Sequence, residues 1–452
     1  MSETGERATF SGKLGFILAT SASAVGLGNL WRFPYETSHY GGGIFVLIYV
    51  ILAFTFGICL MMMEISLGRK TRKSSIAAFG ELSQKHKSIG YLAAIAPFLI
   101  LPTYCVIGGW VLKWLFETTT GNLSLLAKNG GDYWWQFVTG SEVGFGEPSF
   151  WFIVFGFICI LCIIGGVEKG IEKLSRILMP VLLILIVGII CYEMTLPGIW
   201  DGVVYYLRPD MSALTPNTFL GAVSQIFYSM SISMGVLVTY GSYTKNDVDI
   251  EESSISIGAI DTLVAVMAGL MIIPVAFMFN FSDEQGMGLM FVALPQVFAE
   301  MTGGAILAPL FYLLVLFAAL TSAVSMAEAC ASIFTDGTKM DRGKSIMITA
   351  SFIIILGMVC VLSFGNGPLA VNLPFDQGVG WLGFFDSLAN SIIMPISAIV
   401  TCIFIGYVVK ITVLEDDIKQ SSPFRTRRIF GFMIKYVCPI LLTIILIAGI
   451  IG

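Results

Sequence analysis

Two apolar stretches of the sequence are interrupted, at what would be mid-membrane depth, by small and polar residues. The interruptions lie at residues 21–29 and 229–235. A helix that breaks inside a membrane leaves backbone groups without partners, which is tolerated only where the break is buried in protein or lines a polar cavity. For either segment alone, close helix packing through glycine and serine is an equal alternative. Two such breaks, five spans apart, favour a transport site.

A carboxylate lies deep in a third apolar stretch. Asp261 is expected near the middle of a membrane span, where an ionised side chain is costly unless it has a cationic partner. Its position predicts a functional role. The alternative is a purely structural pairing with Tyr49 or Gln225.

Membrane helices must position these residues. Of the 452 residues, 56% are hydrophobic and 12% are charged, whereas soluble proteins carry about 25% charged residues. Apolar runs of about 20 residues recur from near the N-terminus to the end of the chain, so we expect a polytopic all-α membrane protein without a soluble domain or a removed signal peptide. The nine cysteines fall in apolar stretches, which favours free thiols over disulfides or a metal site.

Composition and motifs also exclude several functions. The net charge of −5 and the short basic loops give no nucleic-acid surface. The two histidines, His39 and His86, lie outside mid-membrane positions, and no nucleophile–base set is recognisable, so an enzyme is not expected. Without phosphate-binding loops, ATP-driven pumping is not expected either.

The apolar runs predict about eleven spans, at residues 13–37, 43–68, 89–118, 149–165, 173–196, 218–241, 254–280, 302–334, 345–364, 382–409 and 429–451. Lys and Arg gather in alternate connections, which predicts a multi-pass protein of the cell membrane with a cytoplasmic N-terminus and an extracellular C-terminus. Breaks in the first and sixth spans suggest two five-helix halves of opposite topology. We therefore expect a cytoplasmic segment 1–12, a first repeat 13–196, an inverted second repeat 218–409 and an eleventh helix 429–451.

A motif resemblance refines this architecture. It begins with Gly28-Asn29-Leu30-Trp31-Arg32-Phe33-Pro34-Tyr35 and the triple glycine Gly41-Gly42-Gly43. These residues resemble the neurotransmitter:sodium symporter family, and further matches at Gln225, 294–295 and 318–322 extend the resemblance over nearly the whole chain. It implies a bacterial, leucine-transporter-like protein with a 5+5 inverted repeat whose helices 1 and 6 are broken at mid-membrane.

The chain departs from the family pattern in its span count of about eleven rather than twelve, in Tyr40 before the triple glycine, and in Asp261. Most members have asparagine at both residue positions. Some members hold chloride near the first sodium, and Asp261 could supply that negative charge, with Ala265 where those members have serine. We therefore expect independence from chloride. A buried carboxylate can also take up a proton when sodium leaves, which makes proton counter-transport possible.

The resemblance implies two sodium sites, and broken helices expose the carbonyl oxygens that such sites need. The first would combine the substrate carboxylate with Ala24, Asn29, Ser229 and Asp261. The second would use the carbonyls of Ala22, Val25 and Ala318 with the hydroxyls of Thr321 and Ser322. For the two hydroxyls, bonding back to their own helix is the alternative.

The resemblance also implies a substrate site in which an exposed helix end and a tyrosine hydroxyl hold the substrate carboxylate. Its residues would be Ala24, Gly26, Leu27, Gly28, Ile100, Tyr104, Tyr228, Ser229, Ser231, Met234 and Met326. The mainly apolar lining fits hydrophobic and aromatic L-amino acids. Ordinary helix packing is the alternative for Tyr228, Met234 and Met326.

Two ionic gates complete the implied transport path. Arg32 and Asp386 would form a water-linked outer gate, and Arg7 and Asp336 an inner gate with Phe10 as an apolar plug. Solvated surface charges are the alternative for the inner pair.

The sequence therefore predicts a sodium-coupled secondary active symporter for hydrophobic or aromatic L-amino acids that works by alternating access. A sodium-dependent amino-acid receptor or channel without coupled turnover is the alternative. We expect a small-molecule substrate and the lipid bilayer as partners, and sodium ions, with two sites, as the bound ions. The oligomeric state stays open.

Overall fold

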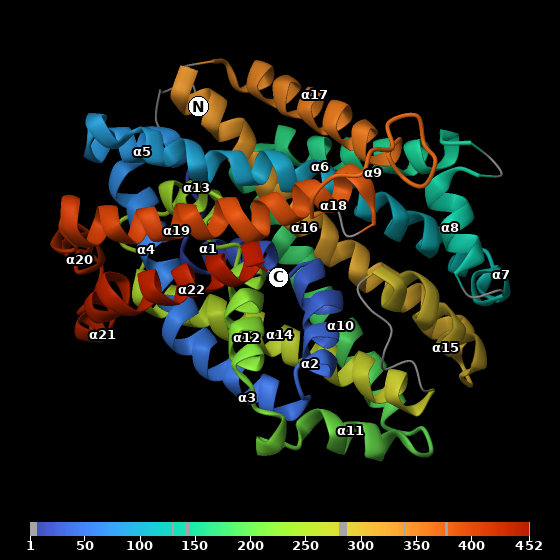
Figure 1. Ribbon diagram of the computed structural model, residues 1–452. Coiled ribbons are helices and arrows are strands. Elements are labelled where there is room, and N and C mark those ends of the chain that lie inside the picture. Colours follow the sequence, from blue (N-terminus) through green and yellow to red (C-terminus); the bar gives the residue numbers. More distant parts are fainter. Residues whose placement is uncertain are drawn as a thin grey trace.

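The computed structural model describes residues 7–128, 131–141, 144–279, 287–338, 340–375 and 378–451. Residues 1–6 of the predicted N-terminal segment and residue 280 of the seventh span lie outside these ranges. Within them the chain consists of helices and turns, with one isolated bridge between Gly42 and Pro209. Figure 1 shows the long helices crossing one another in a single bundle, with the short helices α20 and α21 at one end and α7 and α8 at the other.

The membrane-spanning elements follow the predicted order. They are α1 (Lys13–Ala24), η1 (Gly28–Arg32) and α2 (Phe33–His39); α3 (Gly43–Leu52), η2 (Ala53–Gly57) and α4 (Ile58–Thr71); α6 (Ser88–Thr119); α9 (Gly146–Ile164); η4 (Val167–Glu172) and α10 (Lys173–Glu193); α12 (Pro216–Ser229) and α13 (Val236–Ser242); α14 (Ile250–Met278); α16 (Gly304–Thr338); α17 (Arg342–Val361); α18 (Gly380–Ser387), η7 (Leu388–Ile393), α19 (Met394–Ile403) and η8 (Phe404–Val408); α21 (Arg427–Phe432), η9 (Met433–Val437) and α22 (Cys438–Ile451).

The two unusual spans are broken as predicted. Among the described residues, nine helices are long and apolar enough to cross a membrane singly, and the first span is a pair of helices bent by 52° at its break. The sixth span consists of two shorter helices, α12 and α13, separated by residues 230–235. The prediction of a multi-pass all-α protein with about eleven spans is confirmed, and the broken helices agree with the 5+5 inverted repeat.

The connections contain short helices that the hydropathy pattern did not predict. They are α5 (Ser75–Leu82), η3 (Gln84–His86), α7 (Leu123–Ala127), α8 (Asp132–Thr139), α11 (Ile199–Leu207), η5 (Met211–Ala213), η6 (Leu289–Ala293), α15 (Leu294–Glu300) and α20 (Thr412–Ile418). These helices are too short to span a membrane, which takes about 20 apolar residues. The fifth span also starts earlier than predicted, with η4 at Val167.

The broken spans lie at the centre of the bundle. α1 packs against α10, α14 and α16, while α13 packs mainly against α4. Gly68 of α4 and Gly241 of α13 put these two helices in direct backbone contact, because a Cβ on Gly68 would meet the Val238 carbonyl and a Cβ on Gly241 would meet the Ile65 carbonyl. Small residues at such contacts let membrane helices approach closely.

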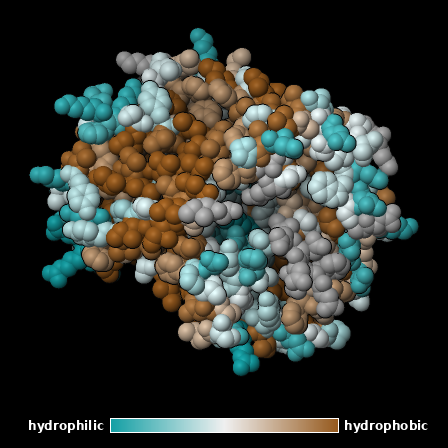
Figure 2. Space-filling view, viewed as in Figure 1, coloured by the Kyte–Doolittle hydropathy of each residue, from teal (hydrophilic) through white to brown (hydrophobic). Residues whose placement is uncertain are grey.

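The outer surface is apolar where lipid would surround it. Figure 2 shows a broad hydrophobic band over the face where Figure 1 places α19 and α22, with hydrophilic residues along the adjoining edge near α20 and α21. Exposed side chains such as Ile403, Ile440 and Ile447 belong to this band. Of the nine cysteines, seven are buried, Cys162 is partly buried and Cys191 on α10 is exposed.

Candidate functional site

The break in the sixth span is held by a carboxylate from the second span. Ser231, Ser233 and Gly235 have positive φ angles of 53°, 62° and 69°. This backbone region is unfavourable for residues other than glycine. Oε1 of Glu64 accepts hydrogen bonds from the N–H group of Ser233 (2.8 Å) and from its hydroxyl (3.2 Å). The strained segment therefore has a buried anchor on α4.

The break in the first span exposes backbone groups toward the centre of the bundle. Val25 has an extended backbone with φ −69° and ψ 102°. The N–H group of Leu27 donates to the hydroxyl of Tyr104 (2.8 Å), and that of Gly26 donates to the side-chain oxygen of Asn29 (3.0 Å). A Cβ on Gly26 would lie 2.6 Å from the Tyr104 hydroxyl. Glycine is needed here because the backbone approaches α6 and α16 so closely.

A small cavity of about 20 Å³ lies between the two breaks. It has room for about one water molecule. The residues that line it are Ser23, Ala24, Gly26, Gly28, Ile100, Tyr104, Tyr228, Ser229, Ser231, Met234, Ser322 and Met326. These include every predicted substrate residue except Leu27, whose backbone N–H faces Tyr104 while its side chain is buried elsewhere. Ser23 and Ser322 are additions to the predicted lining.

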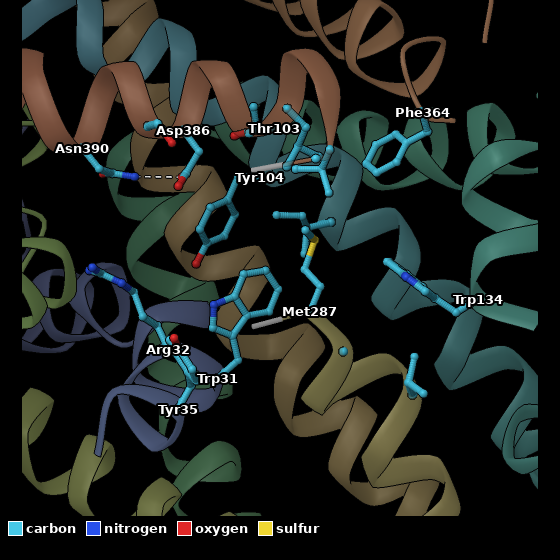
Figure 3. Close-up of a pocket in the computed structure, with 18 of the residues that line it drawn as sticks. Trp31, Arg32, Tyr35, Thr103, Tyr104, Trp134, Met287, Phe364, Asp386 and Asn390 are labelled. Atoms are coloured by element: carbon cyan, nitrogen blue, oxygen red, sulfur yellow. Dashed lines mark hydrogen bonds between the residues drawn. The ribbon is translucent and has the colours of Figure 1, made fainter. Parts of the chain in front are cut away.

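A wide vestibule of about 1010 Å³ lies above this cavity. Tyr104 and Tyr228 line both spaces and so form the boundary between them. Figure 3 shows Trp31 and Arg32 on one wall, Asp386 and Asn390 on the opposite wall, and Tyr104 between them. The vestibule gives the small cavity a path to one side of the molecule.

The predicted outer pair shares the vestibule without direct contact. Nε of Arg32 pairs with Glu36 at 3.2 Å, and its guanidinium carbon lies 5.1 Å from the centre of the Tyr228 ring. Asp386 accepts a hydrogen bond from Nδ2 of Asn390 at 2.8 Å (Figure 3). Each charge of the predicted gate therefore has another partner in this conformation.

Two carboxylates, Glu36 and Glu64, contribute to the site although motif reasoning did not single them out. A signal was present for both. Glu64 is the one acidic residue in the stretch 43–68, and Glu36 lies one helical turn after Arg32, which is the spacing of a helical ion pair.

We expect Glu36 to delay closure of the outer gate by competing with Asp386 for Arg32. Glu36→Gln keeps the side-chain size but removes the charge, so Arg32 becomes available to Asp386. A double-mutant cycle measures this competition through the initial uptake rate. Asp386→Asn should reduce that rate about two- to fivefold more in the Glu36→Gln background than in wild type, which corresponds to the energy of a partly exposed ion pair. Additive effects would mean that the two carboxylates do not compete.

Asn29 and Ser229, two of the predicted ligands of the first sodium site, form a buried cluster with Asp261. Nδ2 of Asn29 donates to Oδ1 of Asp261 (2.8 Å), and the hydroxyl of Ser229 lies 2.9 Å from Oδ2. The Tyr49 hydroxyl is 3.5 Å away, whereas Gln225 donates to the Gly28 carbonyl instead of pairing with Asp261. Among the described residues, no partner of Asp261 is cationic.

One detail of this cluster differs from the predicted ligand set. The Asn29 oxygen, predicted as a sodium ligand, accepts the Gly26 N–H, and its amide group faces Asp261. An amide oxygen has two lone pairs, so the contact to Gly26 leaves one free for an ion. The cluster thus combines a carboxylate, a hydroxyl and an amide oxygen in a fully buried place.

The predicted ligands of the second sodium site connect the first and eighth spans. The hydroxyl of Ser322 on α16 lies 2.9 Å from the Ser23 carbonyl and 3.3 Å from the Val25 carbonyl. The Thr321 hydroxyl bonds back to its own helix, at 3.0 Å from the Phe317 carbonyl and 3.1 Å from that of Ala318. Ala22 is buried in the last turn of α1. The Ser322 hydroxyl thus connects α16 to the end of α1, whereas Thr321 adopts the back-bonded arrangement.

The inner pair is in direct contact. Nη1 of Arg7 lies 2.7 Å from Oδ1 of Asp336, and Nη2 donates to the Ser242 hydroxyl at 2.7 Å. Burial acts to lower the pKa of Arg7, but the neighbouring Tyr243 and Asp336 outweigh it and hold that pKa above its ordinary value. Arg7 is therefore charged over the whole physiological range.

Phe10 closes the same end of the molecule. Its side chain is buried and packs against three aromatic rings, with centroid distances of 5.7 Å to Phe16, 5.5 Å to Tyr240 and 6.2 Å to Tyr243. The molecule is thus closed at the Arg7 end and hollow at the vestibule end.

Comparison with known proteins gives matches along nearly the whole chain. A family model described as the sodium:neurotransmitter symporter family matches residues 7–136 and 132–452. An uncharacterized sodium-dependent transporter of Haemophilus influenzae is 30% identical over 98% of this chain and 98% of its own length. The sodium-dependent dopamine transporter of Caenorhabditis elegans is 24% identical over 96% of this chain and 79% of its own.

The fold has a similar counterpart among solved structures. The crystal structure of MhsT in complex with L-phenylalanine matches with a TM-score of 0.88 and 33% sequence identity, covering 98% of this chain and all of the other.

Proposed function

Because the chain belongs to the sodium:neurotransmitter symporter family, we propose that it is a sodium-coupled secondary active symporter for hydrophobic and aromatic L-amino acids. The observation that carries this proposal is the buried cavity between two broken helices. It lies next to Asp261, a carboxylate that has no cationic partner among the described residues. A family of transporters also argues against enzymatic activity.

The lining of the cavity supports an amino acid with an apolar side chain. The Leu27 N–H and the Tyr104 hydroxyl stand where a substrate carboxylate needs donors, at the exposed helix end. Ile100, Met234 and Met326 line the remaining wall, and thioether side chains adapt to ligands of different shape. The match to MhsT, solved with L-phenylalanine, supports an aromatic substrate. Such a ligand needs more than the present space, so the lining must open for it.

The residues present fit sodium at both proposed positions. A buried carboxylate is costly without a cation, and the Asp261 cluster offers the oxygen ligands that a hard cation prefers. Bound there, sodium would neutralise Asp261 and attract the substrate carboxylate, so that ion and substrate bind together. A second ion among Ser322, Thr321 and the carbonyls of α1 would fix α1 to α16.

The two ends of the path support alternating access. The contacts of Arg7 and Phe10 close one end, and the vestibule opens the other. Tyr104 and Tyr228 would close over a bound substrate, after which release requires the Arg7–Asp336 pair to separate. By the distribution of Lys and Arg, we place the closed end in the cytoplasm and the protein in the cell membrane.

Uptake into proteoliposomes tests the proposal. Labelled L-phenylalanine should accumulate above its external concentration when sodium is imposed outside, and should not do so with choline. Equilibration without accumulation would indicate a channel, and sodium-dependent binding without uptake would indicate a receptor. Equally tight binding in sodium and choline buffers would contradict the coupling itself.

We expect Ile100 to limit the size of the substrate. Ile100→Phe adds volume to a fully packed wall, and overpacking costs about 1–3 kcal/mol. Uptake of tryptophan should therefore fall about tenfold or more, while uptake of alanine and valine changes about twofold at most. The control Ile100→Val should leave tryptophan transport intact. Equal losses for large and small substrates would assign Ile100 to folding or gating.

A further inference from the structure

A basic groove of about 860 Å³ lies between α20 and α21, away from the transport path. Arg425, Arg427, Arg428 and Lys435 line it, together with the single acid Glu415. Nε of Arg427 pairs with Glu415 at 2.6 Å. The remaining three basic side chains leave the groove with a positive charge that no lining residue compensates.

Neighbouring helices hold the groove in shape. The two carboxylate oxygens of Glu251, at the start of α14, accept the backbone N–H groups of Arg425 and Thr426, both at 2.8 Å. On the other side, the Tyr407 hydroxyl donates to the Lys435 carbonyl at 2.8 Å. Both carboxylate oxygens of Glu251 are thus occupied by backbone donors, and they fix the backbone that carries Arg425.

The groove opens onto the lipid-facing surface. Ile429, Phe432 and Tyr436 follow it along α21 and η9, with exposed fractions of 56%, 58% and 52%, and Ile440 continues the apolar face onto α22. Figure 2 shows this transition, since the hydrophilic edge near α20 and α21 adjoins the hydrophobic band. A ligand seated here would have its charged part in the groove and apolar chains along the last span.

We propose that this groove binds the headgroup of an anionic glycerophospholipid, with the phosphodiester between Arg428 and Lys435 and the acyl chains against Phe432 and Ile440. Basic pockets beside membrane helices recognise anionic headgroups through charge. A zwitterionic lipid carries a compensating cation and is disfavoured. A soluble partner would leave the apolar face of η9 uncovered.

The site is tested with delipidated protein in detergent by thermal unfolding and native mass spectrometry. Short-chain phosphatidylglycerol should bind and raise the unfolding temperature, whereas phosphatidylcholine and inorganic phosphate at equal concentration should not. Arg428→Gln with Lys435→Gln should raise the half-saturating lipid concentration about tenfold or more. The control pair Lys169→Gln with Lys344→Gln removes the same charge elsewhere and should leave the half-saturating lipid concentration unchanged.

Three results would overturn the assignment: equal stabilisation by phosphatidylcholine, equal stabilisation by inorganic phosphate, or equal losses in the two double variants. Since Arg428 and Lys435 lie outside the transport path, sodium-driven uptake is measured separately, and its outcome does not decide the lipid site.

Discussion

Replacing Thr321 by valine and Ser322 by alanine together should lower sodium affinity about a hundredfold and abolish sodium-driven uptake. Both residues are buried; the Ser322 hydroxyl contacts the Ser23 carbonyl of α1, and the Thr321 hydroxyl contacts the Ala318 carbonyl, another predicted ligand. Each lost interaction with a charged group costs about 1.5–3 kcal/mol, so the pair accounts for about two decades or more in affinity. Calorimetric titration of sodium into sodium-free protein measures the loss.

The control for this variant is Thr349→Val with Ser351→Ala on α17. These hydroxyls also bond back to their own helix, at 3.0 Å and 2.9 Å, but lie outside the proposed ion site. The control should keep its sodium affinity. If the test variant binds sodium as wild type does and still unfolds cooperatively, the second ion site lies elsewhere.

In Asp261→Asn, chloride should begin to stimulate sodium-driven uptake, which we expect to be chloride-independent in wild type. The substitution keeps the size of the side chain and removes the fixed negative charge beside the first sodium site. A fixed charge within hydrogen-bond range contributes about 1 kcal/mol or more, so chloride should raise the uptake rate about fivefold. Adding Ala265→Ser, one turn further along α14, should strengthen the effect by offering chloride a hydroxyl.

The same variant tests proton return. If Asp261 takes up a proton at the inner side when sodium leaves, an acidic liposome interior should accelerate wild-type uptake and leave Asp261→Asn unaffected. Sodium binding to each variant serves as the check on folding. The proposed role of Asp261 would be ruled out if wild type required chloride. It would also be ruled out if both variants bound sodium but their uptake responded neither to chloride nor to internal pH.

Local patterns predicted the breaks and most of the cavity. Small and polar residues at mid-span are visible in the sequence itself, and the resemblance around Gly28 and Arg32 supplied the partners on other helices. The backbone breaks where the motifs lie, so Gly26, Tyr104 and Ser229 come together as expected. Leu27 is an exception, because the turn after α1 directs its side chain away from the cavity.

Choices between partners could not be predicted in the same way. Whether Arg32 pairs with Asp386 or Glu36 depends on rotamers and on the state of the outer gate, not on spacing. Likewise, the Thr321 hydroxyl can face its own helix or an ion with little change in the backbone. The support of the sixth-span break by Glu64 depends on α4 lying beside α13, a tertiary contact that no local pattern encodes.

The backbone contact between α4 and α13 has a mechanical consequence. Helices that touch through Gly68 and Gly241 interlock, since neighbouring side chains fill the flanks and leave no layer in which one could slide past the other. The inner half of the sixth span is therefore coupled to the second span, and α12, the outer half, packs mainly against α3 of that same span. The segment 230–235, strained and anchored by Glu64, joins these two halves, so the second span supports the sixth on both sides of its break.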